Sequence, residues 1–263
     1  WVLDLDGIKT IPGLLEESES PYNYVYVLDR QGERWLKLNE GVGLQSVYLA
    51  GAGLAGGIWD YFLIAPFFNA PPTTPADVDN LLLIGLAGGT VARLYTEAFG
   101  PIPIDGVELD PEVIRLARKW LEMNLPNLNA VVQDGRVFLR HSANTYDVIA
   151  LDAYRPPYIP FHLTTVEFFC EAFAHLNDDG VLVVNVGRTP KDYRLVNAIA
   201  ATLYQVFPSV YVVDEPDYGE DLANSLVVAT VQPTRLDNLQ ENLIYVEQPL
   251  LVEMLQRAIP QTR

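Results

Sequence analysis

The sequence has very little cysteine. Its 263 residues include one cysteine, Cys170, which excludes an internal disulfide framework. Proteins without disulfides are typical of reducing compartments, so we expect a cytoplasmic protein. Cys170 lies in the apolar run VEFFCEAF, and a buried small side chain is a simpler interpretation there than a nucleophile.

Positive charge is also scarce. The chain carries 17 basic and 34 acidic residues, which gives a formal net charge of −17. This excess of negative charge argues against nucleic acid or an anionic membrane surface as a partner. It is compatible with a cationic substrate, although surface acidity commonly serves solubility alone.

Histidine is rare, and the sequence predicts no metal site. His141, His162 and His175 are scattered, without the spacing of metal ligands and without cysteine partners. His175 falls near the end of an expected helix, where a positive charge would interact favourably with the helix dipole.

Long hydrophobic runs are missing as well. The least polar window, residues 49–68, contains four glycines, Asp60 and Pro66, which is unsuited to a membrane span. We therefore expect no membrane contact by this chain. It begins at Trp1 rather than Met and shows no signal-peptide pattern, so we expect it to be a piece of a longer protein.

The chain is patterned differently in two parts. Residues 1–70 contain short Tyr- and Val-rich runs separated by glycine turns, at 22–29, 34–39 and 45–49, and predict a small β-rich domain. A helix is expected over WDYFLIAPFF, and NAPPTTPAD (69–77) has the composition of a linker.

Residues 77–263 alternate apolar strands with helices and are expected to form the second domain. This alternation predicts a mostly parallel, doubly wound sheet. The runs SVYVVDE and NSLVVATV would close that sheet as an antiparallel pair. The predicted fold class is therefore α/β, with a Rossmann-like domain behind the β-rich unit.

The residues that follow each strand are candidate ligand contacts, because open parallel sheets bind ligands at the carboxyl ends of their strands. The first strand leads into GLAGGT, which contains Gly85, Gly88 and Gly89. Glycines there let the backbone approach a ligand. The spacing is not GxGxxG, and the loop alone could be a tight turn.

Two carboxylates strengthen the case for a nucleoside. Glu108 ends the second strand, at the spacing where such folds bind ribose hydroxyls. Asp134 and Gly135 follow the third strand. Asp134 could accept a hydrogen bond from the amino group of adenine, or it could cap the helix that follows. Without GxGxxG and with a terminal antiparallel pair, the pattern favours an S-adenosylmethionine-type ligand over NAD.

At these positions the chain resembles the spermidine synthase (polyamine aminopropyltransferase) family. IGLAGGTVARL resembles the family's glycine-rich loop, VELDPEVIRLAR its ribose-binding segment, QDGRVFL its adenine-side Asp-Gly, and YDVIALDAYRPP its segment with the pattern DxxDP. The resemblance implies a methyltransferase-type fold and a homodimer. It also implies transfer of an aminopropyl group from decarboxylated S-adenosylmethionine to a diamine, with the donor as a co-substrate and no tightly bound cofactor.

The resemblance also implies roles for individual residues. Asp152, at the end of the fourth strand, falls on the family's proton acceptor, while Gln45 and Tyr61 fall on its substrate-side glutamine and tyrosine. Tyr154 could contact the substrate or simply pack in its loop. Arg155 stands where the family has a second aspartate that holds the diamine.

Two departures from the family pattern concern ammonium groups. Gly88 replaces the aspartate that holds the donor's amine, and Arg155, if it points inward, would repel a cationic acceptor or pair with Asp152. Orthodox use of putrescine is therefore in doubt. An S-adenosylmethionine-dependent methyltransferase and a non-catalytic nucleoside-binding module remain alternatives. The acidic segment 214–221 is interpreted as an exposed turn rather than a cation-gathering loop.

Overall fold

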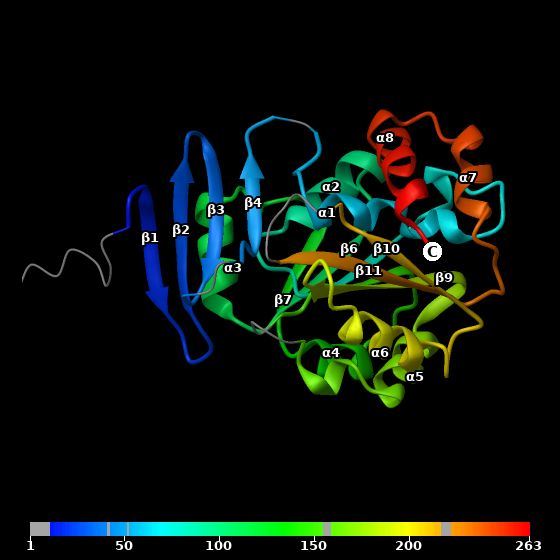
Figure 1. Ribbon diagram of the computed structural model, residues 1–263. Coiled ribbons are helices and arrows are strands. Elements are labelled where there is room, and N and C mark those ends of the chain that lie inside the picture. The colour runs from blue at the N-terminus through cyan, green and yellow to red at the C-terminus, as the bar shows by residue number, and fades with distance from the viewer. Residues whose placement is uncertain (1–10, 41–42, 52, 155–158, 217–221) are drawn as a thin grey trace, which may run out of the picture.

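The computed structural model describes residues 11–40, 43–51, 53–154, 159–216 and 222–263. Its N-terminal part is an antiparallel four-stranded sheet that stands to one side of the larger part of the molecule (Figure 1). The strands follow chain order: β1 (Leu14–Glu19), β2 (Tyr24–Arg30), β3 (Glu33–Leu38) and β4 (Ser46–Leu49). Three of these strands match the predicted β-rich runs, and β1 was not predicted.

The larger part is built on a seven-stranded sheet with the order β10-β11-β9-β8-β5-β6-β7. The strands are β5 (Leu81–Ile84), β6 (Ile104–Glu108), β7 (Leu128–Val132), β8 (Tyr146–Leu151), β9 (Leu176–Arg188), β10 (Ser209–Asp214) and β11 (Ala223–Thr230). β5 pairs in parallel with β6 on one side and β8 on the other. β11 pairs antiparallel with both β9 and β10. The predicted doubly wound sheet with its closing antiparallel pair is confirmed.

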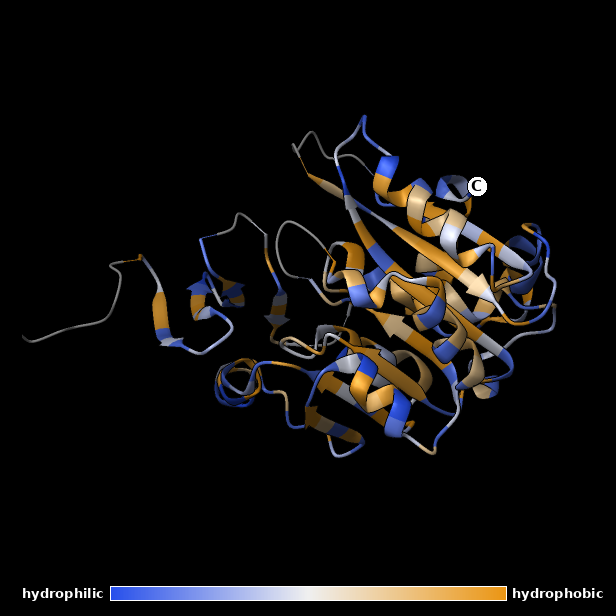
Figure 2. Ribbon diagram, turned by 90° about the horizontal axis from the view of Figure 1, so that it is seen from below, coloured by the Kyte–Doolittle hydropathy of each residue, from blue (hydrophilic) through white to orange (hydrophobic). Residues whose placement is uncertain are grey.

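Helices cover both faces of this sheet (Figure 1). They are α1 (Ile58–Tyr61), α2 (Thr90–Phe99), α3 (Pro111–Trp120), α4 (Gly135–His141), α5 (Val166–Ala174), α6 (Arg194–Leu203), α7 (Asn238–Asn242) and α8 (Pro249–Ala258). Successive residues of β5 point to opposite faces. Leu83 belongs to the core shared with α2 and α8, whereas Leu82 belongs to the core shared with α4, α5 and α6. In Figure 2 the strands of the seven-stranded sheet are largely hydrophobic and the outer helix faces largely hydrophilic.

Two local expectations need correction. The single helix expected over WDYFLIAPFF is instead the short α1 followed by the 3-10 helix η1 (Phe62–Phe68), which contains Pro66. Cys170 is exposed, not buried. The α5 helix buries Phe168, Phe169 and Ala172, and its period of 3.6 residues turns position 170 away from that face.

No helix in the described part of the chain has the length and apolar character needed to cross a membrane. The division into domains at residues 1–70 and 77–263 stays a prediction. Helices α7 and α8, which follow the last strand, were not predicted.

Candidate functional site

The ends of β5 and β8 approach so closely that only glycine fits between them. Gly85 has φ of +93°, and a Cβ placed on it would lie 2.4 Å from the main-chain oxygen of Asp152. The main-chain N–H of Asp152 donates to the carbonyl oxygen of Ile84 over 2.9 Å. Because β5 is also where the strand order reverses, Asp152 lies at the usual ligand position of this fold.

The Asp152 carboxylate is held by two side chains from different elements. The amide Nδ2 of Asn185 on β9 donates to Asp152 Oδ1 over 2.8 Å, and the Trp59 side chain on α1 makes a second hydrogen bond. Burial raises the pKa of Asp152 to about 7, against the lowering effect of these two bonds. A carboxyl group with this pKa can accept a proton and release it again near neutral pH.

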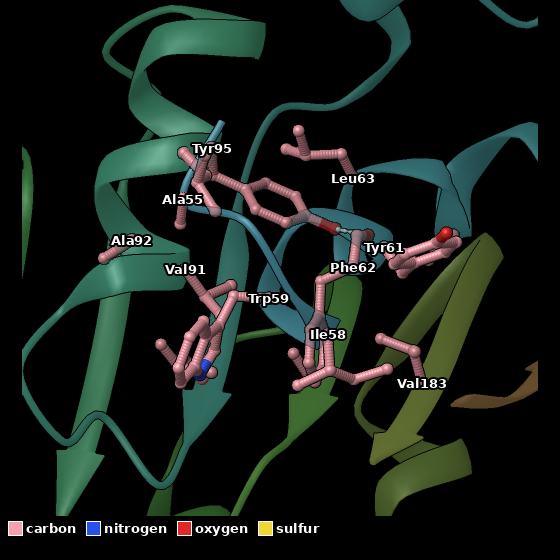
Figure 3. Close-up of a cluster of buried hydrophobic side chains, with 14 of the residues drawn as sticks. Ala55, Ile58, Trp59, Tyr61, Phe62, Leu63, Val91, Ala92, Tyr95 and Val183 are labelled. Atoms are coloured by element: carbon pink, nitrogen blue, oxygen red, sulfur yellow. Dashed lines mark hydrogen bonds between the residues drawn. The ribbon is translucent and has the colours of Figure 1, made fainter. Parts of the chain in front are cut away.

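Trp59 and Tyr61 both come from the α1 turn but leave it in different directions. Figure 3 shows Trp59 beside Val91 of α2, while Tyr61 projects toward the side of Val183 on β9. Tyr61, a predicted substrate residue, is 4% exposed. The turn is braced by Asp60, whose carboxylate accepts hydrogen bonds from the main-chain N–H groups of Ala55 and Gly56 at 2.7 and 2.8 Å.

The hydroxyl group of Tyr154, which follows β8, is hydrogen-bonded to the main chain of β9. The hydroxyl donates to the carbonyl oxygen of Asn185 over 3.1 Å and accepts from the main-chain N–H of Gly187. Burial, followed by the charge of Asp152, raises the pKa of Tyr154. Both hydrogen-bonding directions of the hydroxyl are thus used within the protein. Arg155, the other predicted substrate residue in this loop, lies outside the described residues.

Glu108 shapes the glycine loop from the end of β6. Its Oε2 accepts from the main-chain N–H of Ala87 over 3.0 Å, and its Oε1 accepts from that of Asp110 over 3.1 Å. Burial raises its pKa. The main chain of Leu109 makes a further hydrogen bond to this carboxylate. An ionised carboxylate has about four lone-pair positions, so these backbone donors still leave acceptor capacity for a ligand. Leu109, the next residue, is a 43% exposed apolar side chain.

Asp134 acts as the N-cap of α4. Its Oδ1 accepts from the main-chain N–H groups of Arg136 and Val137, both at 3.0 Å, and its Oδ2 lies 2.9 Å from His162 Nε2. Of the two predicted roles, capping is therefore present in the structure. A Cβ on Gly135 would lie 2.2 Å from Ile84 Cγ2, so glycine allows α4 to pack directly on β5.

Gly88 and Gly89 face protein rather than open space. A Cβ on Gly88 would lie 2.5 Å from Leu121 Cδ2 and 2.6 Å from Ser46 Cβ. The Gly88 N–H donates to Ser46 Oγ over 2.8 Å. A Cβ on Gly89 would lie 2.7 Å from Met123 Cγ. An aspartate at position 88 would therefore displace the small sheet from the loop.

Those contacts bring β4 of the small sheet against the start of α2. The hydroxyl of Thr90 accepts from the N–H of Val47 and donates to its carbonyl oxygen, at 3.1 and 2.9 Å. Gln45, which precedes β4, is partly buried, and its main-chain N–H donates to the carbonyl oxygen of Leu36 over 3.0 Å. The predicted substrate-side glutamine thus lies one residue from the contact with Gly88.

The start of the acidic segment is buried, so the expected exposed turn is wrong there. Glu215 follows β10 at the same sheet edge and is 8% exposed. Its Oε2 accepts from Asn224 Nδ2 over 3.1 Å, and its Oε1 would lie 3.7 Å from a Cβ on Gly57. Asp214 pairs with Arg263 and lies 3.6 Å from Arg188. Residues 217–221 lie outside the described residues.

The histidines have structural roles in the described part of the chain. His162 pairs with Asp134, and His175 ends α5, where its Nδ1 lies 2.9 Å from the carbonyl oxygen of Glu171. The described residues contain no group of three or more His, Cys, Asp or Glu side chains that could hold a metal ion.

Sequence reasoning missed Trp59, Asn185 and Glu215. Asn185 did leave a signal, because it is a polar residue inside the strand run VLVVNV. Trp59 had none, since tryptophan in an apolar helical run is normally a core residue.

Replacing Asp152 should stabilise the folded protein at high pH. The folded pKa is about 7 against an ordinary 3.8, so between these pH values the native state binds a proton that the unfolded state has lost, and stability falls as pH rises. Above pH 7 the full cost of the buried charge is present, and Asp152→Asn removes it. We expect its Tm to rise by roughly several degrees at pH 8 and to change little at pH 4.

Thermal unfolding followed by circular dichroism measures this difference. Asp79→Asn is the matched control, because Asp79 is an exposed carboxylate just before β5, at the opposite sheet edge. A Tm for Asp152→Asn at pH 8 that is no higher than that of the unmodified protein would contradict a costly buried charge.

Comparisons with known proteins agree with this architecture. Among solved structures, a probable spermidine synthase from Corynebacterium glutamicum superposes with a TM-score of 0.73 at 20% identity, covering 95% of both chains. The spermidine synthase of Thermotoga maritima gives 0.66 at 17% identity, covering 94% of this chain and 84% of that one. Human methyltransferase-like protein 13 gives 0.59 at 22% identity, covering 77% and 91%. At these identities the likeness concerns the fold, which is of the methyltransferase type.

Sequence relatives carry the family assignment. A probable polyamine aminopropyl transferase of Bifidobacterium longum is 33% identical over 195 residues, which cover 74% of this chain and 42% of the relative. A polyamine aminopropyltransferase of Vibrio vulnificus is 32% identical over 193 residues, covering 71% and 61%. The chain thus spans about half the length of these relatives. The sequence profile of the spermine/spermidine synthase domain matches residues 76–238, which is more than half of the chain. The chain therefore belongs to the spermine/spermidine synthase family.

Proposed function

We propose that this protein transfers an aminopropyl group from decarboxylated S-adenosylmethionine to an acceptor amine, with Asp152 as the proton acceptor. The observation that carries the proposal is the Asp152 carboxylate, held at the carboxyl end of β8 by Asn185 with its pKa raised to about 7. Relatives named polyamine aminopropyltransferases support the choice of reaction.

The reaction needs a base of this kind. An acceptor amine enters mainly as an ammonium ion and must lose one proton before its lone pair can attack. Asp152 takes that proton, the new carbon–nitrogen bond forms at the carbon next to the sulfonium, and the carbon–sulfur bond breaks. The electron pair of that bond stays on sulfur, which leaves as the thioether methylthioadenosine.

The donor nucleoside would bind along the ends of β5, β6 and β7. Glu108 has unused acceptor capacity for the ribose hydroxyls, and exposed Leu109 offers an apolar surface for the base. Asp134 already caps α4 and contacts His162. We therefore propose that Asp134 positions the Asp134–Gly135 turn and that adenine is recognised by the turn as a whole.

Nucleoside binding should depend on Glu108. Loss of hydrogen bonds to a charged group costs about 1.5–3 kcal/mol, so Glu108→Ala should weaken binding of methylthioadenosine by about 10-fold or more. Titration calorimetry measures this, with Glu253→Ala as a control, because Glu253 is an exposed acid on α8. Equal affinity of both variants would remove Glu108 from the site. Intact S-adenosylmethionine that binds more tightly than its decarboxylated form would favour a methyltransferase.

Turnover should depend on Asp152 and on pH. We expect the unmodified protein to release methylthioadenosine from decarboxylated S-adenosylmethionine with at least one acceptor from a panel of amines that includes putrescine. The rate should fall as pH drops below about 7, because the base becomes protonated. Asp152→Asn should lower the rate by about 10²–10⁴-fold. Mass spectrometry of both products is the measurement. A nucleoside-bound protein that turns over no amine would support the binding-module alternative instead.

A further inference from the structure

Asn185 is a polar side chain in the buried, valine-rich part of β9. It is 5% exposed, and its β9 neighbours Val183, Val184 and Val186 are fully buried. β9 lies between β8 and β11, and Asn185 is directly opposite Leu226. An amide at such a position is destabilising unless its polar atoms are hydrogen-bonded.

Only half of the Asn185 amide is satisfied by the protein. Its Nδ2 donates to Asp152 Oδ1 over 2.8 Å. Its Oδ1 is shielded from solvent and has no hydrogen-bond partner among the described residues. An unsatisfied buried acceptor carries a cost in stability, and a catalytic role is one of the reasons for which a native structure keeps one. A valine or leucine, as at the neighbouring positions, would avoid this cost.

The unsatisfied oxygen belongs to the same amide group that contacts the proposed base. A group that reaches Oδ1 must therefore enter the protein interior beside Asp152. The nucleophilic nitrogen of an acceptor must come to the same place, because it gives a proton to Asp152. A hydrogen-bond donor carried by the substrate would therefore satisfy Oδ1 only while the substrate is bound.

We propose that Asn185 completes the acceptor subsite, with its Oδ1 accepting a hydrogen bond from the nitrogen that Asp152 deprotonates. This inference rests on the proposed function and assigns the acceptor as an amine rather than an alcohol. An ammonium group can give one proton to Asp152 and still direct an N–H at Oδ1. An alcohol has a single hydroxyl hydrogen, which Asp152 would take, and Oδ1 would stay unsatisfied.

The two contacts also fix the direction of attack. Once Asp152 has taken the proton, the nitrogen turns about its carbon–nitrogen bond. Its two remaining hydrogens then point at Asp152 and Asn185, and the lone pair points away from both oxygens. Asn185 cannot shift easily, because its carbonyl oxygen accepts from the Tyr154 hydroxyl and its strand is paired on both sides. Orientation of this kind contributes to rate by restricting the nucleophile before the reaction.

The test replaces Asn185 by residues that separate its two contacts. Asn185→Leu removes both the donor and the acceptor at similar volume. We expect the KM for the amine of that panel that is turned over best to rise by about 10-fold or more, since a charged or strongly polar partner loses its hydrogen bond. Calorimetry should show an unchanged Kd for methylthioadenosine. The pH at which the rate falls should move upward, because the bond that stabilises ionised Asp152 is lost.

A second variant guards against a folding defect. Asn185→Asp keeps an oxygen acceptor but loses the donor, so we expect a smaller rise in KM and again an upward move of the pH profile, since two carboxyl groups would be adjacent. Asn129→Leu is the matched control, because Asn129 is a strand residue that donates to an aspartate, Asp105, over 2.7 Å, and it is exposed on β7. Its kinetic constants and pH profile should not change.

The outcomes separate the inference from the function on which it rests. If Asn185→Leu binds methylthioadenosine normally and uses the same amine with an unchanged KM and pH profile, the inference is wrong and the proposed function stands. If the unmodified protein binds methylthioadenosine but neither binds nor turns over an amine, the proposed function fails and the inference fails with it.

Discussion

The close approach of Gly85 to the main chain of Asp152 is the constraint on which the site depends. It joins the ends of β5 and β8, the two strands on either side of the switch in strand order. A side chain at position 85 would separate these ends, because its Cβ would lie 2.4 Å from a carbonyl oxygen. The glycine loop, which would hold the donor, and the carboxylate, which would act on the acceptor, are positioned by this one contact.

Beside that contact the Asp152 carboxylate is held where burial disfavours its ionised form. Burial raises the pKa of Asp152, and the hydrogen bonds from Asn185 and Trp59 reduce the rise without cancelling it. The three groups come from β8, β9 and α1, so the pKa is a property of the assembled fold rather than of one segment. The burial that allows this carboxyl group to exchange a proton near neutral pH also lowers the stability of the folded protein at that pH.

The small sheet takes part in the same assembly. Ser46 and Val47 on β4 bond to Gly88 and Thr90 of the loop and of α2. The packing that brings Gln45 near the loop also fills the space that an aspartate at position 88 would need. The close packing of the small sheet on the loop therefore leaves no room for a carboxylate at position 88.

Much of this could be predicted from the sequence, because strand ends are local features. Gly85, Glu108, Asp134 and Asp152 could be recognised from the residues that follow each apolar run, and the sheet order confirms that these positions share an edge. The partners of those residues could not, because Trp59, Asn185 and Asp152 are far apart in the chain. The exposure of Cys170 and the burial of Glu215 likewise depend on how elements pack rather than on local pattern.

The most direct test of this account is the titration of Asp152 itself. Carbon-13 NMR of the aspartate carboxyl carbons, with the signal assigned by its loss in Asp152→Asn, would follow this group from pH 4 to pH 9. The account predicts a midpoint near pH 7. A midpoint near the ordinary value of about 4 would show that the carboxylate is solvated, and would contradict a base held at neutral pH by burial.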